Sequence, residues 1–168
     1  MYTIRSAIEM DRSALGEIFY RSWQVAYREI LPANVWDELD PAIAEPRGEI
    51  DPRTTHVLSD GTKVFGVIVF GPSRSVDRSG WGEIYALYLL PEYIGQGWGK
   101  ALLGHGVEKL FDLGFSNIHL WVVEQNTRAK RLYEQNRFRP SGDTKSRQFL
   151  GSSVTEVEYQ YQKESNRS

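Results

Sequence analysis

The chain has 168 residues, of which 40% are hydrophobic and 25% charged, with a formal net charge of -2 and no cysteine. This length and balance predict one globular domain whose core needs no metal or disulfide to hold it. The charge disfavours a general nucleic-acid binder, and the lack of cysteine excludes disulfides, thiolate metal sites and a cysteine nucleophile. The sequence shows no signal pattern at Met1–Glu9 and no apolar run of membrane-spanning length, so we expect a cytoplasmic protein.

Strands and helices alternate along the chain in an order that indicates a mixed sheet. The expected strands are 2–5, 55–58, 64–70, 81–90, 118–123, 147–150 and 154–161. The expected helices are 11–30, 32–47, one from the glycine-rich segment 95–99 to Gly114, and 127–136. An Asp-Gly turn at 60–61 predicts a hairpin. We therefore expect one α/β domain over 1–163, followed by a frayed tail at 164–168.

Three glycines at alternate positions lie between a predicted strand and a predicted helix: Gly95, Gly97 and Gly99. They let the backbone turn tightly and leave its N–H groups free at the positive end of a helix, which favours a phosphate ligand. The segment fails as a P-loop, because Ile94 replaces the first glycine and Ala101 replaces the hydroxyl residue that binds magnesium. It fails as a dinucleotide motif because Lys100 replaces the third glycine.

The same segment resembles the phosphate motif of the GNAT superfamily of acetyl-CoA-dependent N-acetyltransferases, Gln/Arg-x-x-Gly-x-Gly/Ala, with Ile94 in place of the first polar residue. The family also has an asparagine followed by alanine at +3 and tyrosine at +7, and Asn126, Ala129 and Tyr133 match this pattern on one helix face. The usual Gly-Phe that follows is here Arg137-Phe138. We expect Asn136 to take the left-handed conformation instead.

The resemblance implies a GNAT-like α/β fold: a mixed, mostly antiparallel sheet of six to seven strands with about four helices, splayed at the cofactor cleft. It implies transfer of acetyl from acetyl-CoA to a primary amine of a small molecule, directly in a ternary complex. Neither a metal nor a covalent nucleophile is needed. That agrees with the absence of cysteine and with three histidines that we expect to be isolated, at positions 56, 105 and 119.

The resemblance also implies where the cofactor binds. The backbone of the strand before the loop would bond pantetheine, at Leu87, Tyr88 and Leu89. The loop itself would hold the pyrophosphate, through Gly95, Gln96, Gly97, Trp98, Gly99 and Lys100. Asn126 would hold the pantetheine arm or cap its helix. A basic cluster could meet the 3′-phosphate of coenzyme A or form a solvated helix face: Arg128, Lys130 and Arg131.

Two residues are the candidate catalytic groups. Tyr133 would assist the leaving thiolate, by donating a hydrogen bond rather than by full proton transfer, which is uphill by roughly 2 kcal/mol from reference pKa values. Glu83 would act as base through water or attract the ammonium, and a solvated strand-end glutamate is the alternative. Alternation along the strand predicts that residues 83, 85, 87 and 89 share a face. Glu124 is a weaker candidate base.

Trp23 and Tyr27 lie one helical turn apart and could wall the acceptor pocket, although core packing also accounts for Trp23. Two other functions stay open: a catalytically silent CoA-binding sensor, and a protein or peptide N-acetyltransferase. As partners we expect a small-molecule amine, no nucleic acid and no membrane, with homodimerisation left open.

Overall fold

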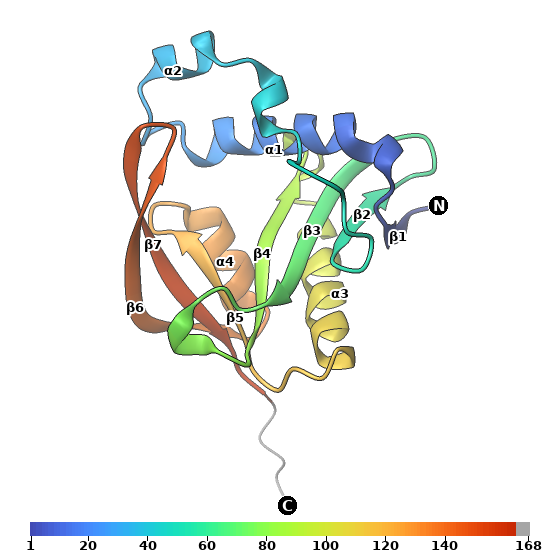
Figure 1. Ribbon diagram of the computed structural model, residues 1–168, viewed down its shortest axis with the longest axis vertical. Helices are drawn as coiled ribbons and strands as arrows, with labels where there is room; N and C mark the ends of the chain where they lie inside the picture. Colours follow the sequence, from blue (N-terminus) through green and yellow to red (C-terminus); the bar gives the residue numbers. More distant parts are fainter. Residues whose placement is uncertain (164–168) are drawn as a thin grey trace, which may run out of the picture.

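The computed structural model describes residues 1–163 and contains one seven-stranded sheet with strand order β1-β2-β3-β4-β5-β7-β6 (Figure 1). The strands are β1 (Thr3–Ser6), β2 (Thr55–Ser59), β3 (Val64–Pro72), β4 (Gly82–Leu89), β5 (Ile118–Val123), β6 (Phe138–Phe149) and β7 (Ser152–Tyr161). The α-helices are α1 (Arg12–Ala26), α2 (Ala33–Glu38), α3 (Trp98–Asp112) and α4 (Thr127–Gln135). The predicted tail at 164–168 lies outside the described residues.

Every neighbouring pair of strands is antiparallel except β4 and β5, which are parallel. These two strands pair only over Gly82–Ile84 and Ile118–Leu120, although both continue beyond that point. Figure 1 shows them diverging towards α1 and the β6–β7 hairpin. The second half of β4 therefore has backbone groups that no strand pairs with on its β5 side. This confirms the mixed sheet that splays at its middle.

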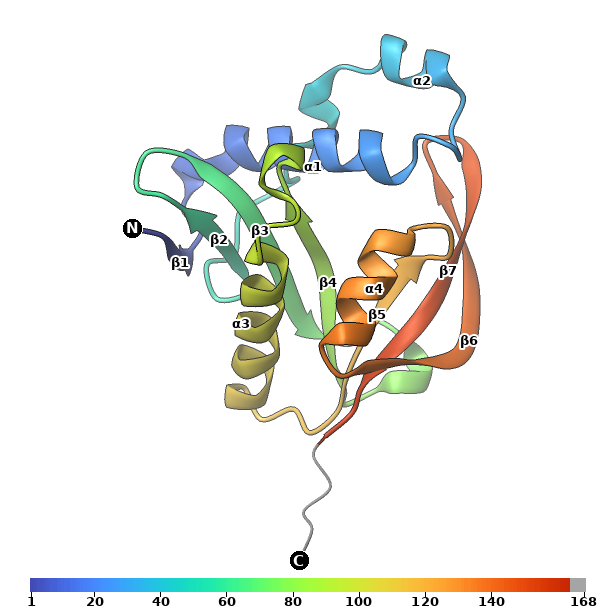
Figure 2. The same cartoon turned by 180° about the vertical axis from the view of Figure 1, so that it is seen from behind.

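Helices cover both faces of the sheet and place the core between them. Figure 2 shows α3 and α4 side by side on one face, with α1 beyond the sheet. On the α3 face, Gly106 lets the helix approach Ile68 and Ile84 closely. On the other face, the ring of Phe19 in α1 packs 5.3 Å from that of Tyr88. No helix within residues 1–163 is long and apolar enough to cross a membrane.

A bulge in β4 changes which side chains point to which face. Phe70 pairs with Ile84 and Val69 with Ala86, so Tyr85 has no partner on β3. An extra residue on one strand reverses the alternation beyond it. Tyr88 consequently faces α1, whereas Leu89 lies beside Gly99 of α3. The prediction that residues 83, 85, 87 and 89 share one face is wrong for this reason.

Three predicted elements differ in extent. The helix expected over 11–30 is α1, which ends at Ala26. The expected helix over 32–47 is reduced to α2 and a 3-10 turn, Pro41–Ala44, because Pro41 and Pro46 interrupt it. Strand β6 begins at Phe138, well before the predicted 147–150.

At the end of α4 the left-handed residue is Arg137, with φ 73°, and not Asn136, with φ -122°. The amide of Asn136 instead donates to the carbonyl of Leu132 at 2.7 Å. Its side chain therefore caps the helix, and the next residue turns the chain.

Candidate active site

A cleft of about 1680 Å³ passes through the sheet where β4 and β5 diverge. On the α3 and α4 side it is lined by the glycine loop and the first turns of both helices. On the α1 side it is lined by aromatic and charged side chains from α1, β4, β5, β6 and β7. One continuous cavity therefore joins a site at a helix N-terminus to a pocket on the opposite face of the sheet.

The glycine loop forms an open N-terminus at α3. Gly95 and Gly97 adopt φ +84° and +91°, and a Cβ on either would meet nothing within 4 Å. These positive φ angles require glycine, and the space beside them is free for a ligand. No side chain caps α3, so the N–H groups of its first turn have no helical partner. Together with the helix dipole, they fit a pyrophosphate.

The other loop residues make different contacts from one another. A Cβ at Gly99 would lie 3.1 Å from Leu132 of α4, so this glycine permits close helix packing and is not needed to keep ligand space open. The amide of Gln96 turns back and donates to the carbonyl of Glu92 at 3.0 Å. The ring of Trp98 packs 5.7 Å from that of Phe65, and neither Gln96 nor Trp98 lines the cleft. The side chain of Lys100 lines the cleft.

Asn126 begins α4 as its N-cap. Its Oδ1 accepts from the N–H of Ala129 at 3.2 Å, which is the capping role considered from the sequence, and the residue also lines the cleft. Of the basic cluster, Arg128 and Arg131 line the cleft. Lys130 instead donates to the carbonyl of Glu124 at 3.0 Å. Two of the three predicted cations therefore line the cleft beside the start of α4.

Tyr133 lies on the buried face of α4 and is 7% exposed. Its ring packs near the rings of Phe138 and Tyr159. Its hydroxyl makes no hydrogen bond with residues 1–163, and the residue lines the cleft. Burial raises the pKa of Tyr133 to about 12. The hydroxyl is thus a free donor that stays protonated at any physiological pH.

Glu83 is held by an ion pair. It is 1% exposed, and its two oxygens accept from the N–H and the guanidinium of Arg74 at 2.9 and 2.8 Å. His119 Nε2 lies 3.9 Å from the same carboxylate. Glu83 lines the cleft, but both of its oxygens already accept hydrogen bonds from Arg74. This is an obstacle to the base role expected from the sequence.

The three histidines are not isolated. His56 Nδ1 lies 2.6 Å from His105 Nε2, which links β2 to α3. Burial, followed by the charges of neighbouring basic groups, lowers the pKa of His105 to about 4. His119 is fully buried, and its Nε2 lies 2.7 Å from Ser73 Oγ. Its Nδ1 lies 2.8 Å from a carboxylate oxygen of Glu158, but the two atoms do not have hydrogen-bond geometry. Within residues 1–163 no group of three acidic, histidine or cysteine side chains could hold a metal.

On the α1 side, the predicted Trp23 and Tyr27 do meet, through a residue not predicted from the sequence. Phe149 of β6 stacks on Tyr27 at 4.3 Å and receives the edge of Trp23 at 5.1 Å. Arg147 donates to the Tyr27 hydroxyl at 2.6 Å and to Glu156 Oε1 at 3.1 Å. All five residues line the cleft, so Trp23 and Tyr27 both pack against neighbouring rings and form part of the cleft wall.

The side chain of Tyr88 lies on the same side of the cleft, next to Phe19 of α1, so Tyr88 lines the cleft with more than its backbone. Burial, and then the neighbouring Tyr27 and Tyr133, raise the pKa of Tyr88 above its ordinary value. The sequence signal that could have identified this end is the alternate spacing of charged residues, at 145 and 147 and again at 156 and 158, on or next to two predicted strands.

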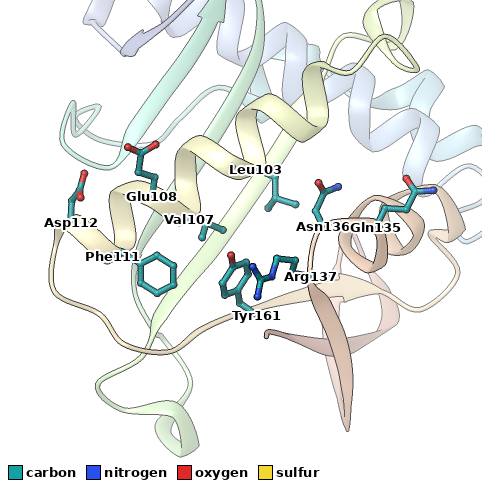
Figure 3. Close-up of a pocket in the computed structure, with 10 residues that line it drawn as sticks. Leu103, Val107, Glu108, Phe111, Asp112, Gln135, Asn136, Arg137 and Tyr161 are labelled. Atoms are coloured by element: carbon teal, nitrogen blue, oxygen red, sulfur yellow. The ribbon is translucent and has the colours of Figure 1, made fainter. Parts of the chain in front are cut away.

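A smaller pocket, about 430 Å³, lies between α3, the corner from α4 to β6 and the end of β7 (Figure 3). Val107, Phe111 and Tyr161 line it, with Glu108 and Asp112 at one side. It adjoins the main cleft at Gln135 and Asn136, which line both.

Comparison with known proteins agrees with this geometry. The acetyltransferase (GNAT) family model matches residues 14–138. The chain is 37% identical over 128 residues to the uncharacterized N-acetyltransferase YuaI of Bacillus subtilis, covering 75% of this chain and 74% of that protein. It is 31% identical over 105 residues to the mycothiol acetyltransferase of Geodermatophilus obscurus, covering 61% of this chain and only 34% of that longer protein.

Among solved structures, the PaiA N-acetyltransferase of Thermoplasma acidophilum, crystallised with coenzyme A, superposes with a TM-score of 0.67. It is 20% identical and covers 96% of this chain and 99% of its own. That likeness shows the fold, and the family match extends over most of the chain. This chain belongs to the acetyltransferase (GNAT) family and is an acyltransferase.

Proposed function

We propose that this chain transfers the acetyl group of acetyl-CoA to the primary amine of a small molecule, by direct transfer in a ternary complex. The observation that carries the proposal is the continuous cleft through the splayed sheet, with an anion site on one face and an aromatic pocket on the other. Such a cleft lets two substrates enter from opposite sides and meet between β4 and β5. The enclosing rings of Trp23, Tyr27 and Phe149 favour a small amine over a peptide.

The chain's own groups account for cofactor binding. The N–H groups at the start of α3 would hold the pyrophosphate, next to the free space at Gly95 and Gly97. The backbone of Leu87, Tyr88 and Leu89, which β5 does not pair, would bond the pantetheine amides. The thioester supplies an acetyl group already activated for attack by an amine.

Three groups would then act on the reaction. A backbone N–H of 87–89 would stabilise the oxyanion as the amine nitrogen bonds to the carbonyl carbon. The Tyr133 hydroxyl would donate to the sulfur as the carbon–sulfur bond breaks. The ammonium would lose one proton to water or to a carboxylate of the pocket before it attacks. The second proton, released from nitrogen as the amide forms, would pass to the leaving thiolate through water.

We assign the ammonium contact to Glu156. Its Oε1 is bonded to Arg147, whereas no residue in 1–163 bonds its Oε2, and it lines the cleft. Glu83, the base expected from the sequence, has both oxygens bonded to Arg74.

The test is turnover of acetyl-CoA by the purified chain with a panel of small primary amines, read as free thiol and by mass spectrometry of the product. Calorimetry with CoA, ATP and NAD accompanies it. We expect CoA to bind and ATP and NAD not to, and at least one amine to be acetylated. Binding of ATP without CoA would refute the cofactor assignment. Acetylation of a protein N-terminus with no small amine acetylated would refute the substrate class.

A further inference from the structure

The acceptor end of the cleft carries an excess of positive charge. Lys145, Arg147 and Phe149 on β6 alternate with outward residues, and the pairing of Lys145 with Glu156 on β7 sets them beside that carboxylate. Arg147 reaches across to Tyr27, at the C-terminal end of α1, which shows that these β6 side chains face the pocket. All of these side chains line the cleft.

The carboxylates nearby do not neutralise this row. Glu83 is paired with Arg74, and Glu158 is paired with Arg78 at 2.8 Å. Glu29, which also lines the cleft, is matched in charge by its neighbour Arg28. One carboxylate, Glu156, therefore remains between Lys145 and Arg147, at 4.0 and 3.1 Å. Two cations therefore share one anion inside a substrate cleft, which leaves a net positive charge to be matched by a ligand.

Both cations keep donors available for a ligand. The ammonium of Lys145 makes no hydrogen bond with residues 1–163 and lies 4.5 Å from the ring of Trp121. Arg147 uses Nε and one Nη for Glu156 and Tyr27, and its other Nη bonds no residue in the described chain. Aromatic rings hold both side chains in place, so little ordering is needed when an anion binds.

We infer that the acceptor amine also carries a carboxylate, which Lys145 and Arg147 bind while Glu156 contacts the ammonium. This inference rests on the proposed function and names its substrate class. Opposite charges on adjacent side chains suit an acceptor whose amine and carboxylate are separated by one carbon, as in an α-amino acid. The rings of Trp23, Tyr27 and Phe149 would receive an apolar side chain.

The experiment compares matched acceptors that differ only in the carboxylate: phenylalanine and its amide, and methionine and its amide. We expect wild-type kcat/KM to be at least tenfold higher for each acid. Lys145→Gln should raise KM for the acids about tenfold, with kcat and the amide kinetics nearly unchanged, because a charge-assisted contact is lost. Lys63→Gln is the control. Lys63 is about as exposed as Lys145 and also lies 4.0 Å from a glutamate, but it does not line the cleft.

A second measurement does not depend on turnover. The acid that lacks the amine, 3-phenylpropionate, should compete with the acceptor, and Lys145→Gln should weaken its inhibition constant about tenfold. Equal kcat/KM for acid and amide, or a Lys145→Gln variant that binds 3-phenylpropionate as wild type does, would overturn this inference while the acetyltransferase assignment stands. If no small amine of any class is acetylated, the proposed function fails first and this inference with it.

Discussion

Tyr133→Phe tests the chemical step most directly. The ring stays to pack against Phe138 and Tyr159, and only the hydroxyl is removed. Burial raises the pKa of Tyr133 to about 12, whereas a thiol has a reference pKa of about 8.5. At about 1.36 kcal/mol per unit, complete transfer of the proton to the thiolate would cost about 5 kcal/mol. The hydroxyl is therefore expected to act as a hydrogen-bond donor.

We expect kcat to fall on the order of 10²-fold, within the range of positioned proton donors, and the KM for acetyl-CoA to change little. Initial rates of thiol release with an identified acceptor measure this. Wild-type kcat should also show no fall up to pH 10, because Tyr133 ionises only near pH 12. A tyrosine of ordinary pKa would begin to lose its proton there.

Tyr159→Phe provides the control. Tyr159 is also buried and lies beside Tyr133. Its hydroxyl donates a hydrogen bond to Glu134 at 2.7 Å, and neither residue lines the cleft. That variant should lose roughly 1 kcal/mol of stability and keep its kcat. If Tyr133→Phe retains wild-type kcat, or if both variants lose it equally, the hydroxyl of Tyr133 has no role in the reaction.

The remaining predictions concern stability and the two carboxylates. Burial holds the pKa of His105 at about 4, so below pH 6.5 the unfolded chain binds a proton that the folded chain does not. The free energy of unfolding should fall by up to about 3 kcal/mol between pH 6.5 and 4. His105→Leu should weaken this dependence in thermal melts and leave the part due to His56 and His119, because burial also lowers the pKa of those two side chains. Gly104→Ala should stabilise the fold by about 0.5–1 kcal/mol, because a Cβ there meets nothing and the helix gains propensity; a lower Tm would contradict this. Glu156→Gln should raise the acceptor KM about tenfold. Glu83→Gln should mainly lower Tm, and a kcat deficit that grows as pH falls would instead restore Glu83 as the base.

The order of elements, the glycine loop and the helix with Asn126 and Tyr133 could be predicted from the sequence alone. Each depends on residues close together in the chain: apolar spacing, Asp-Gly and Gly114 at turns, prolines that end helices. The hairpin at Gly61 and the helix end at Gly114 follow from backbone angles that glycine adopts readily, φ +94° and +95°. Local chemistry of this kind needs no knowledge of the fold.

The acceptor end could not be predicted in the same way, because contacts between distant residues create it. The bulge at Tyr85 depends on pairing with β3, and it reverses the side on which Tyr88 lies. Arg147 meets Tyr27 across 120 positions of sequence. Strand register and helix packing decide such contacts, so the pocket and its excess charge depend on the tertiary structure, whereas the glycine loop follows from residues adjacent in the sequence.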